Sequence, residues 1–252
     1  MENPRDFRKA VHKAFVEYVI PDIEGNMGEA SARLRDIVLE GLAPSGPFSA
    51  STPEAIHIGQ IMNGVFAIDE ILDRVLDAEV YIRRFPYSHT RVAKVRHLRH
   101  VYENYWNDVY ILEERLKRFL KTLVDLYAGG DWKTPVGQNL QPLCKHIDNK
   151  AFKPFAKVRG MHVHEGTYID SDLRRLGTLE YLFQTSESEP WYDAIGTLYR
   201  IDYDRIRSER TRSIRVLNES IRKFVEQYFS LVYPVIFDDY GNMRLPPQFR
   251  SP

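Results

Sequence analysis

The sequence of 252 residues is poor in cysteine, has no excess of either charge and contains no long apolar run. Its single cysteine, Cys144, excludes a disulfide within the chain and a zinc site built from cysteines. The 35 basic and 35 acidic residues cancel, so attraction to a polyanion must come from local patches rather than from net charge. The longest apolar runs, such as VYPVIF, are too short to span a bilayer.

Several functional signatures are also missing. The opening residues MENPRDFRKAV lack the apolar core of a signal peptide, so we expect a protein of the reducing cytoplasm that has no membrane partner. The chain has no glycine-rich phosphate loop, no G-x-S-x-G nucleophile turn and no HExxH zinc motif. Cys144 has only His146 as a nearby base, and we expect it to be a buried small side chain.

Apolar residues at helical spacing run through almost the whole sequence. The clearest segment is 90–127, where they alternate steps of four and three residues: Leu98, Tyr102, Tyr105, Val109, Leu112, Leu116, Phe119, Leu123 and Leu126. Residues 53–85 repeat this register, and only FPYSHT separates the two segments. We therefore expect two long helices that fold back as an antiparallel hairpin, with Leu112 and Leu116 buried.

Shorter helices are predicted at 5–20, 27–40, 151–165, 171–184 and 190–200, and a long one at 203–233. No strand pattern of convincing length appears, so the predicted fold class is all-α, a helical bundle built on the hairpin. Residues 1–50 are expected to form an N-terminal helical extension, 51–236 the bundle and 237–252 a flexible tail.

Charge is segregated although the total is zero. Residues 80–102 contain no acid but many basic groups, a second basic stretch spans 145–159, and a third, 200–222, holds seven arginines. From the first two stretches we predict these nucleic-acid contacts: Arg83, Arg84, Arg91, Lys94, Arg96, Arg99, Lys153 and Lys157. The alternative is that these stretches are ordinary solvated helix faces.

The segment AFKPFAKVRGMHVHEGTYID is the densest in reactive groups. Arg159 and His164 form an R-x4-H pair, and His162, Glu165 and Tyr168 are possible auxiliary groups. A guanidinium can hold a phosphate, and an imidazole can shuttle a proton near neutral pH. Together they suffice for RNA cleavage without a metal or cofactor. His162-x-His164-Glu165 could also be read as metal ligands. A His-x-His pair points two side chains the same way on a strand but not on a helix, and no third ligand is identifiable, so no metal is predicted.

An R-x4-H pair placed after the long helix HVYENYWNDVYILEERLKRFLKTL resembles the HEPN superfamily over residues 55–235. The resemblance implies a HEPN-like helical bundle, a homodimer and metal-independent ribonuclease activity, with Arg159 binding phosphate and His164 acting as the catalytic histidine. It also implies a prokaryotic toxin or antiviral defence setting, with RNA as substrate and an antitoxin or other regulatory protein as possible partner. The alternative is a catalytically silent HEPN-type module that binds a partner protein or nucleotide.

The spacing of the pair has a geometric consequence. Five residues along a straight helix turn two side chains about 140° apart. Arg159 and His164 must therefore share a distorted helix, or Arg159 of one subunit must meet His164 of the other. Other pairs also satisfy R-x4-6-H, such as Arg84/His89 and Arg91/His97, but they lack the placement of the Arg159/His164 pair after the long helix and a basic stretch.

Overall fold

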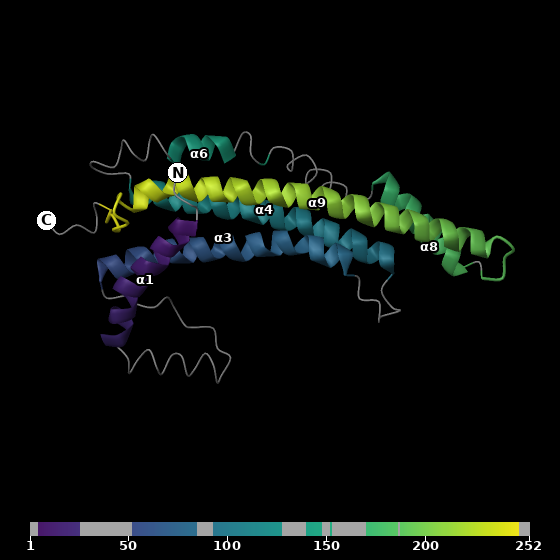
Figure 1. Cartoon of the computed structure of the whole chain (residues 1–252), viewed down its shortest axis with the longest axis horizontal. Helices are drawn as coiled ribbons and strands as arrows, with labels where there is room; N and C mark the ends of the chain where they lie inside the picture. The colour runs from purple at the N-terminus through teal and green to yellow at the C-terminus, as the bar shows by residue number, and fades with distance from the viewer. Residues whose placement is uncertain are drawn as a thin grey trace. The chain divides into compact units, whose positions relative to one another are not determined.

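A computed structural model of the chain describes residues 5–25, 52–84, 93–127, 140–147, 152, 170–185 and 187–246. Its helices are α1 (Arg5–Gly25), α3 (Pro53–Arg83), α4 (Lys94–Leu126), α6 (Gln141–His146), α8 (Ser171–Thr185) and α9 (Tyr192–Ile236) (Figure 1). In these ranges there is no β-strand, and a single antiparallel bridge joins Phe237 to Met243. The predicted all-α class is thereby confirmed for the described part of the chain.

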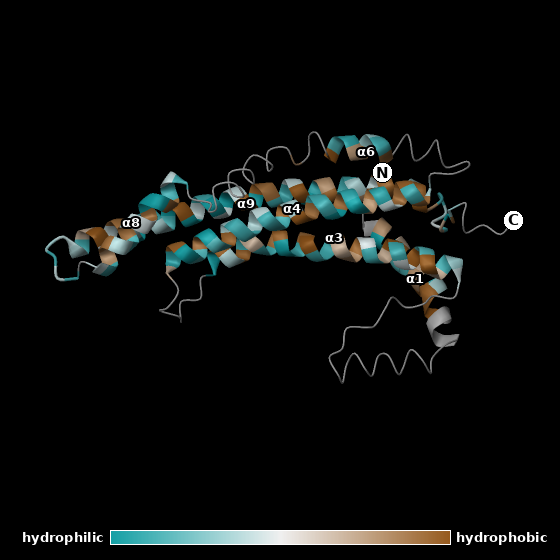
Figure 2. Ribbon diagram, turned by 180° about the vertical axis from the view of Figure 1, so that it is seen from behind, coloured by the Kyte–Doolittle hydropathy of each residue, from teal (hydrophilic) through white to brown (hydrophobic). Residues whose placement is uncertain are grey.

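The chain divides into two compact units. The first contains residues 1–69, 115–147 and 225–252, and the second contains 70–114 and 148–224. Helices α3, α4 and α9 contribute residues to both. Figure 2 shows apolar and polar residues alternating along α4 and α9, as expected of helices that bury one face.

In the first unit α3 and α4 run antiparallel. Gly64 of α3 lies against the ring of Phe119 of α4. His57, nearer the start of α3, is hydrogen-bonded to Tyr127, which directly follows α4 (Nε2 to Oη, 2.8 Å). Leu116 is completely buried. Helix α1 joins this core through Phe7, whose ring stacks on Phe229 of α9 with 4.9 Å between centroids.

The start of α3 follows from its sequence. The hydroxyl of Thr52 accepts a hydrogen bond from the backbone N–H of Ala55 at 3.2 Å, which makes Thr52 the N-cap. Pro53 occupies the first helical position, where a missing N–H costs nothing.

The chain turns back after α9. The Asp238 carboxylate accepts hydrogen bonds from the N–H groups of Tyr240 (2.9 Å) and Asn242 (2.8 Å), and Gly241 takes a φ of 79°, which favours glycine. The Tyr127 hydroxyl donates to the carbonyl of Arg244 at 2.8 Å. Residues 237–246 are therefore attached to the core of the first unit.

In the second unit α9 packs against α3 and α8. The Asn218 amide donates to the carbonyl of Leu76 at 3.3 Å. The Tyr199 hydroxyl donates to the buried Glu180 carboxylate of α8 at 2.6 Å. Helix α8 begins at Asp170, whose carboxylate caps the N–H of Leu173 at 2.8 Å. The α3–α4 pairing continues here, since Arg74 contacts Asp108 at 2.6 Å, and Leu112 is fully buried.

The helices differ from the sequence prediction at three places. Residues 192–200 and 203–233, expected in two separate helices, belong to the single helix α9. Helix α1 continues past Pro21 to Gly25, and the short helix α6 was not predicted. No described helix combines the length and the apolarity needed to cross a membrane. The helix predicted at 27–40 lies outside the described residues, and so does the one predicted at 151–165 apart from Phe152.

Candidate nucleic-acid interface

The second unit contains a pocket whose described lining is made of guanidinium and hydroxyl groups. It has a volume of about 450 Å³ and is lined by Arg83, Arg207, Ser208, Thr211, Arg212 and Arg215. Helix α9 supplies all of these except Arg83, the last residue of α3. Ser208, Thr211, Arg212 and Arg215 follow the i, i+3, i+4, i+7 spacing, so one face of α9 presents them together.

Glu79 fixes two of these arginines. Its carboxylate accepts hydrogen bonds from Arg215 at Nε (3.1 Å) and Nη2 (2.7 Å), and Arg83 lies 3.7 Å from the same oxygen. The hydrogen bond from Arg215 is the main cause that lowers the pKa of Glu79 below its ordinary value. Glu79 therefore stays ionised and holds both guanidinium groups at the pocket.

Arg207 connects the pocket to a lysine of α4. Its guanidinium lies 5.5 Å from the ring centroid of the buried Tyr203, and the Lys94 ammonium lies 5.4 Å from the same centroid. The two cations thus share one aromatic ring. Arg207 also pairs with Asp204 at 3.2 Å, but Asp204 does not line the pocket.

Other arginines of α9 form ion pairs outside the pocket. Arg205 contacts Glu209 at 3.0 Å and Asp202 at 3.4 Å. Arg210 forms an ion pair with Asp170 of the α8 cap. Arg212, in contrast, has no ion pair or hydrogen bond with another residue in the described part of the chain. The seven arginines of 200–222 therefore include members whose ion pairs lie outside the pocket and members that line it.

The chemistry of the pocket suits phosphate. Four guanidinium groups converge, and a guanidinium carries five N–H donors, so the N–H groups that are not bonded within the protein can donate to phosphate oxygens. The hydroxyl of Ser208 adds another donor. The described lining residues include no aromatic or amide side chain that could stack on or read a base. They also include no imidazole or carboxyl group that could transfer a proton. These residues can bind a phosphate backbone, and none of them is an acid–base catalyst.

The predicted catalytic residues Arg159 and His164, and their possible auxiliaries His162, Glu165 and Tyr168, lie outside the described residues. The same holds for Arg91, Lys153 and Lys157 of the predicted binding set. Their proposed roles remain predictions.

The structure places the rest of the predicted binding set as follows. Arg83 lines the pocket, and Lys94 is linked to it through Tyr203. Arg84 and Arg96 are exposed, and Arg99 is half-buried on α4. The charge pattern of the sequence indicates the basic stretch 200–222 but does not distinguish Arg207, Arg212 and Arg215 within it. Their helical spacing with Ser208 and Thr211 was the signal that could have identified them.

Two other reactive side chains, His57 and Cys144, lie outside the arginine pocket. His57 is completely buried and bonded to Tyr127, and burial lowers its pKa to about 4. Cys144 is half-buried on α6, not fully buried as expected. Within the described ranges, no three His, Cys, Asp or Glu side chains are grouped so as to hold a metal ion.

Comparison of the chain with family models, with curated proteins and with solved structures finds no match.

Proposed function

We propose that this chain binds RNA through its phosphate backbone and cleaves it as a metal-independent endoribonuclease of the HEPN type. The observation that carries the binding part is the arginine pocket of the second unit, where Arg83 of one basic stretch meets Arg207, Arg212 and Arg215 of another. Local convergence of cations gives a neutral chain the attraction to a polyanion that its net charge cannot provide.

The catalytic part of the proposal rests on the R-x4-H pair and on the resemblance that it carries. His164 would deprotonate the attacking 2′-hydroxyl or protonate the 5′-oxygen leaving group. Arg159 would stabilise the charge that develops on the phosphorane. The attack closes a 2′,3′-cyclic phosphate and breaks the bond to the 5′-oxygen, so no metal is required.

A homodimer belongs to the same proposal. On one straight helix the side chains of Arg159 and His164 point about 140° apart. In a homodimer each site can instead combine Arg159 of one subunit with His164 of the other. A regulatory protein such as an antitoxin, in a toxin or defence system, would then act by covering the RNA-binding surface or the dimer site.

The decisive experiment measures cleavage and binding separately on mixed-sequence single-stranded RNA in excess EDTA. His164→Ala should reduce cleavage by a factor on the order of 10² to 10⁴, the usual effect of losing one general acid–base group, and should preserve binding. Arg159→Ala should impair both. His146→Ala, an exposed position on α6, is the matched control and should change neither.

The second candidate, a catalytically silent module that only binds, is favoured if wild-type protein binds RNA but never cuts it. The arginine pocket supports this candidate independently, because the residues described in its lining include no acid–base group. Cleavage that is equally fast with His164→Ala would also contradict the ribonuclease proposal.

A further inference from the structure

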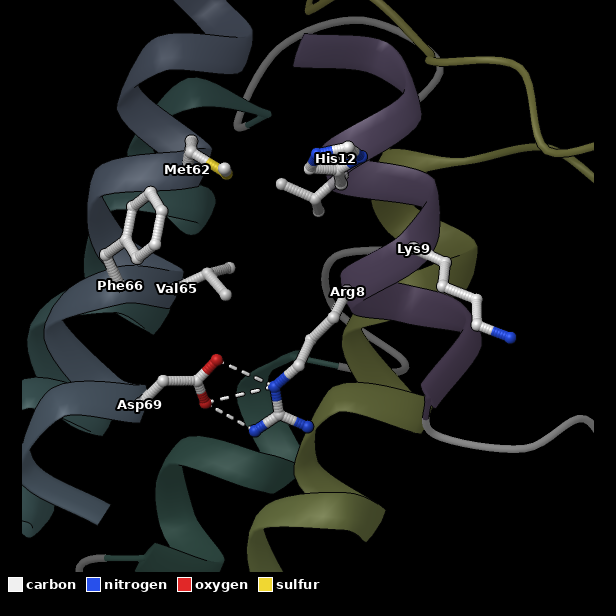
Figure 3. Close-up of a pocket in the computed structure, with 8 residues that line it drawn as sticks. Arg8, Lys9, His12, Met62, Val65, Phe66 and Asp69 are labelled. Atoms are coloured by element: carbon white, nitrogen blue, oxygen red, sulfur yellow. Dashed lines mark hydrogen bonds and ion pairs between the residues drawn. The ribbon is translucent and has the colours of Figure 1, made fainter. Parts of the chain in front are cut away.

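The first unit has its own pocket, between α1 and α3, which shares no residue with the arginine pocket (Figure 3). Its volume is about 380 Å³, within the usual range of roughly 300–1,000 Å³ for small-molecule sites. The apolar walls are Val11 of α1 and Met62, Val65 and Phe66 of α3. Val11 and Val65 are buried, but Phe66 keeps 61% of its surface exposed. The apolar wall of this pocket is therefore accessible to solvent.

An internally satisfied ion pair closes one end of this pocket. Arg8 donates through Nε to both carboxylate oxygens of Asp69, at 3.0 and 2.8 Å, and also through Nη2 (Figure 3). The Arg8 guanidinium lies 4.7 Å from the ring centroid of Phe229. The Arg8 guanidinium is thus held by both Asp69 and Phe229, and its charge is neutralised by the Asp69 carboxylate.

The other ionisable groups in the described lining, Lys9 and His12, are both basic. Both are exposed on α1, and the described lining residues include no acid other than Asp69. Figure 3 places the His12 ring beside the gap, across from Met62, whereas the Lys9 ammonium points away from α3. A neutral imidazole and an imidazolium both carry an N–H that can donate to a carboxylate. The rim of the pocket therefore complements an anion, and its walls complement an apolar body.

We propose that this pocket binds a small amphipathic carboxylate, with its apolar body against Met62, Val65 and Phe66 and its carboxylate at His12. The Arg8–Asp69 pair forms the polar end of the cavity and limits the length of the bound molecule. Lys9 contributes to the positive potential of the rim without direct contact.

The test uses 1-naphthoate as the probe and isothermal titration calorimetry on the full chain. Phe66→Ala should weaken binding about 5- to 10-fold, because it removes an apolar wall. His12→Ala should weaken it about threefold or more, since it removes the donor to the carboxylate. The uncharged analogue 1-naphthalenemethanol should bind at least about threefold more weakly than 1-naphthoate for the same reason.

Two matched controls separate the pocket from general adsorption. Ile56→Ala removes another exposed apolar side chain of α3, and Lys13→Ala removes another exposed cation of α1; neither residue lines the pocket. The affinity of both variants for 1-naphthoate should stay within about twofold of the wild-type affinity, because surface substitutions away from a site have small effects. Phe66 and His12 are exposed, so their variants should fold. No binding of 1-naphthoate at millimolar concentration, equal binding of the alcohol, or equal losses in the controls would overturn the proposal.

Discussion

A buried imidazole joins three parts of the first unit. The Tyr127 hydroxyl gives its proton to the carbonyl of Arg244, so it can only accept from His57, whose Nε2 must carry a hydrogen. His57 is completely buried, and burial lowers its pKa to about 4 from an ordinary value of 6.5. The folded protein therefore holds a neutral histidine over a pH range in which an exposed histidine would take up a proton.

This arrangement predicts a loss of stability in mild acid. Because the folded-state pKa of His57 lies below its unfolded value, the unfolded chain binds the proton first as the pH falls. The free energy of unfolding should therefore decrease between pH 6.5 and about 4, by up to about 3 kcal/mol from this group. Urea unfolding at a series of pH values measures the effect.

The variant His57→Gln should flatten this part of the pH profile, since glutamine does not titrate. His100→Gln changes an exposed histidine of α4 and should leave the slope as in wild type. An identical slope in wild type and His57→Gln would assign the acid sensitivity to other groups.

At the scale of the helices, the close approach of α3 and α4 depends on a glycine. A Cβ placed on Gly64 would lie 2.6 Å from Cε2 of the buried Phe119 ring, and closer still to its Cδ2. Gly59, five residues earlier on α3, has nothing within 4 Å of the same position. The same substitution should therefore have opposite effects at these two sites.

Gly64→Ala should destabilise the protein by about 1–2 kcal/mol, because the overlap with Phe119 outweighs the helix preference of alanine. Gly59→Ala should stabilise it by about 0.5–1 kcal/mol, since only the preference remains. Chemical denaturation monitored by circular dichroism gives both values. Stabilisation by Gly64→Ala would mean that α3 and α4 are not in contact there.

The helices also show which elements can be predicted from the sequence. The register of 53–85 and 90–127 predicted α3 and α4 within a few residues, because periodic burial over many turns is a strong local signal. The break expected between 200 and 203 is absent, since no glycine or proline lies there and Tyr199 and Tyr203 both remain on the buried face of α9.

The site was harder to predict than the helices. The ion pairs of Arg205 lie on its own helix, with Asp202 and Glu209 three and four residues away, so helical spacing alone indicates them. The contact of Arg215 with Glu79 joins residues 136 positions apart, and no local pattern indicates it. Sequence patterning finds a basic stretch, but tertiary packing decides which of its members line the pocket.

At the scale of the whole molecule, zero net charge coexists with a concentrated positive site. Long-range attraction is therefore weak, and RNA binding should depend on contacts at the arginine pocket. Such contacts release counterions from the RNA, which makes the affinity strongly dependent on salt.

Replacing Arg212 and Arg215 with alanine should weaken RNA binding to a similar extent for all sequences. It should also reduce the log–log salt slope by about 0.7 for each lost contact to single-stranded RNA. Filter binding or fluorescence anisotropy between 50 and about 200 mM salt measures the slope. Arg205→Ala removes a guanidinium of α9 that does not line the pocket, and it should keep the wild-type slope. Equal slopes in all three proteins would exclude the pocket as the binding surface.

The stacking of Phe7 on Phe229 has a consequence for how the protein is made. The two rings lie 4.9 Å apart but stand at opposite ends of the chain, 222 residues apart in sequence. At a synthesis rate of about 5–20 residues per second, the ribosome needs on the order of 10–40 s to produce Phe229 after Phe7. During that interval Phe7 on the apolar face of α1 cannot pack against Phe229. A nascent chain of this protein should therefore be a client of ribosome-associated chaperones until its last helix emerges.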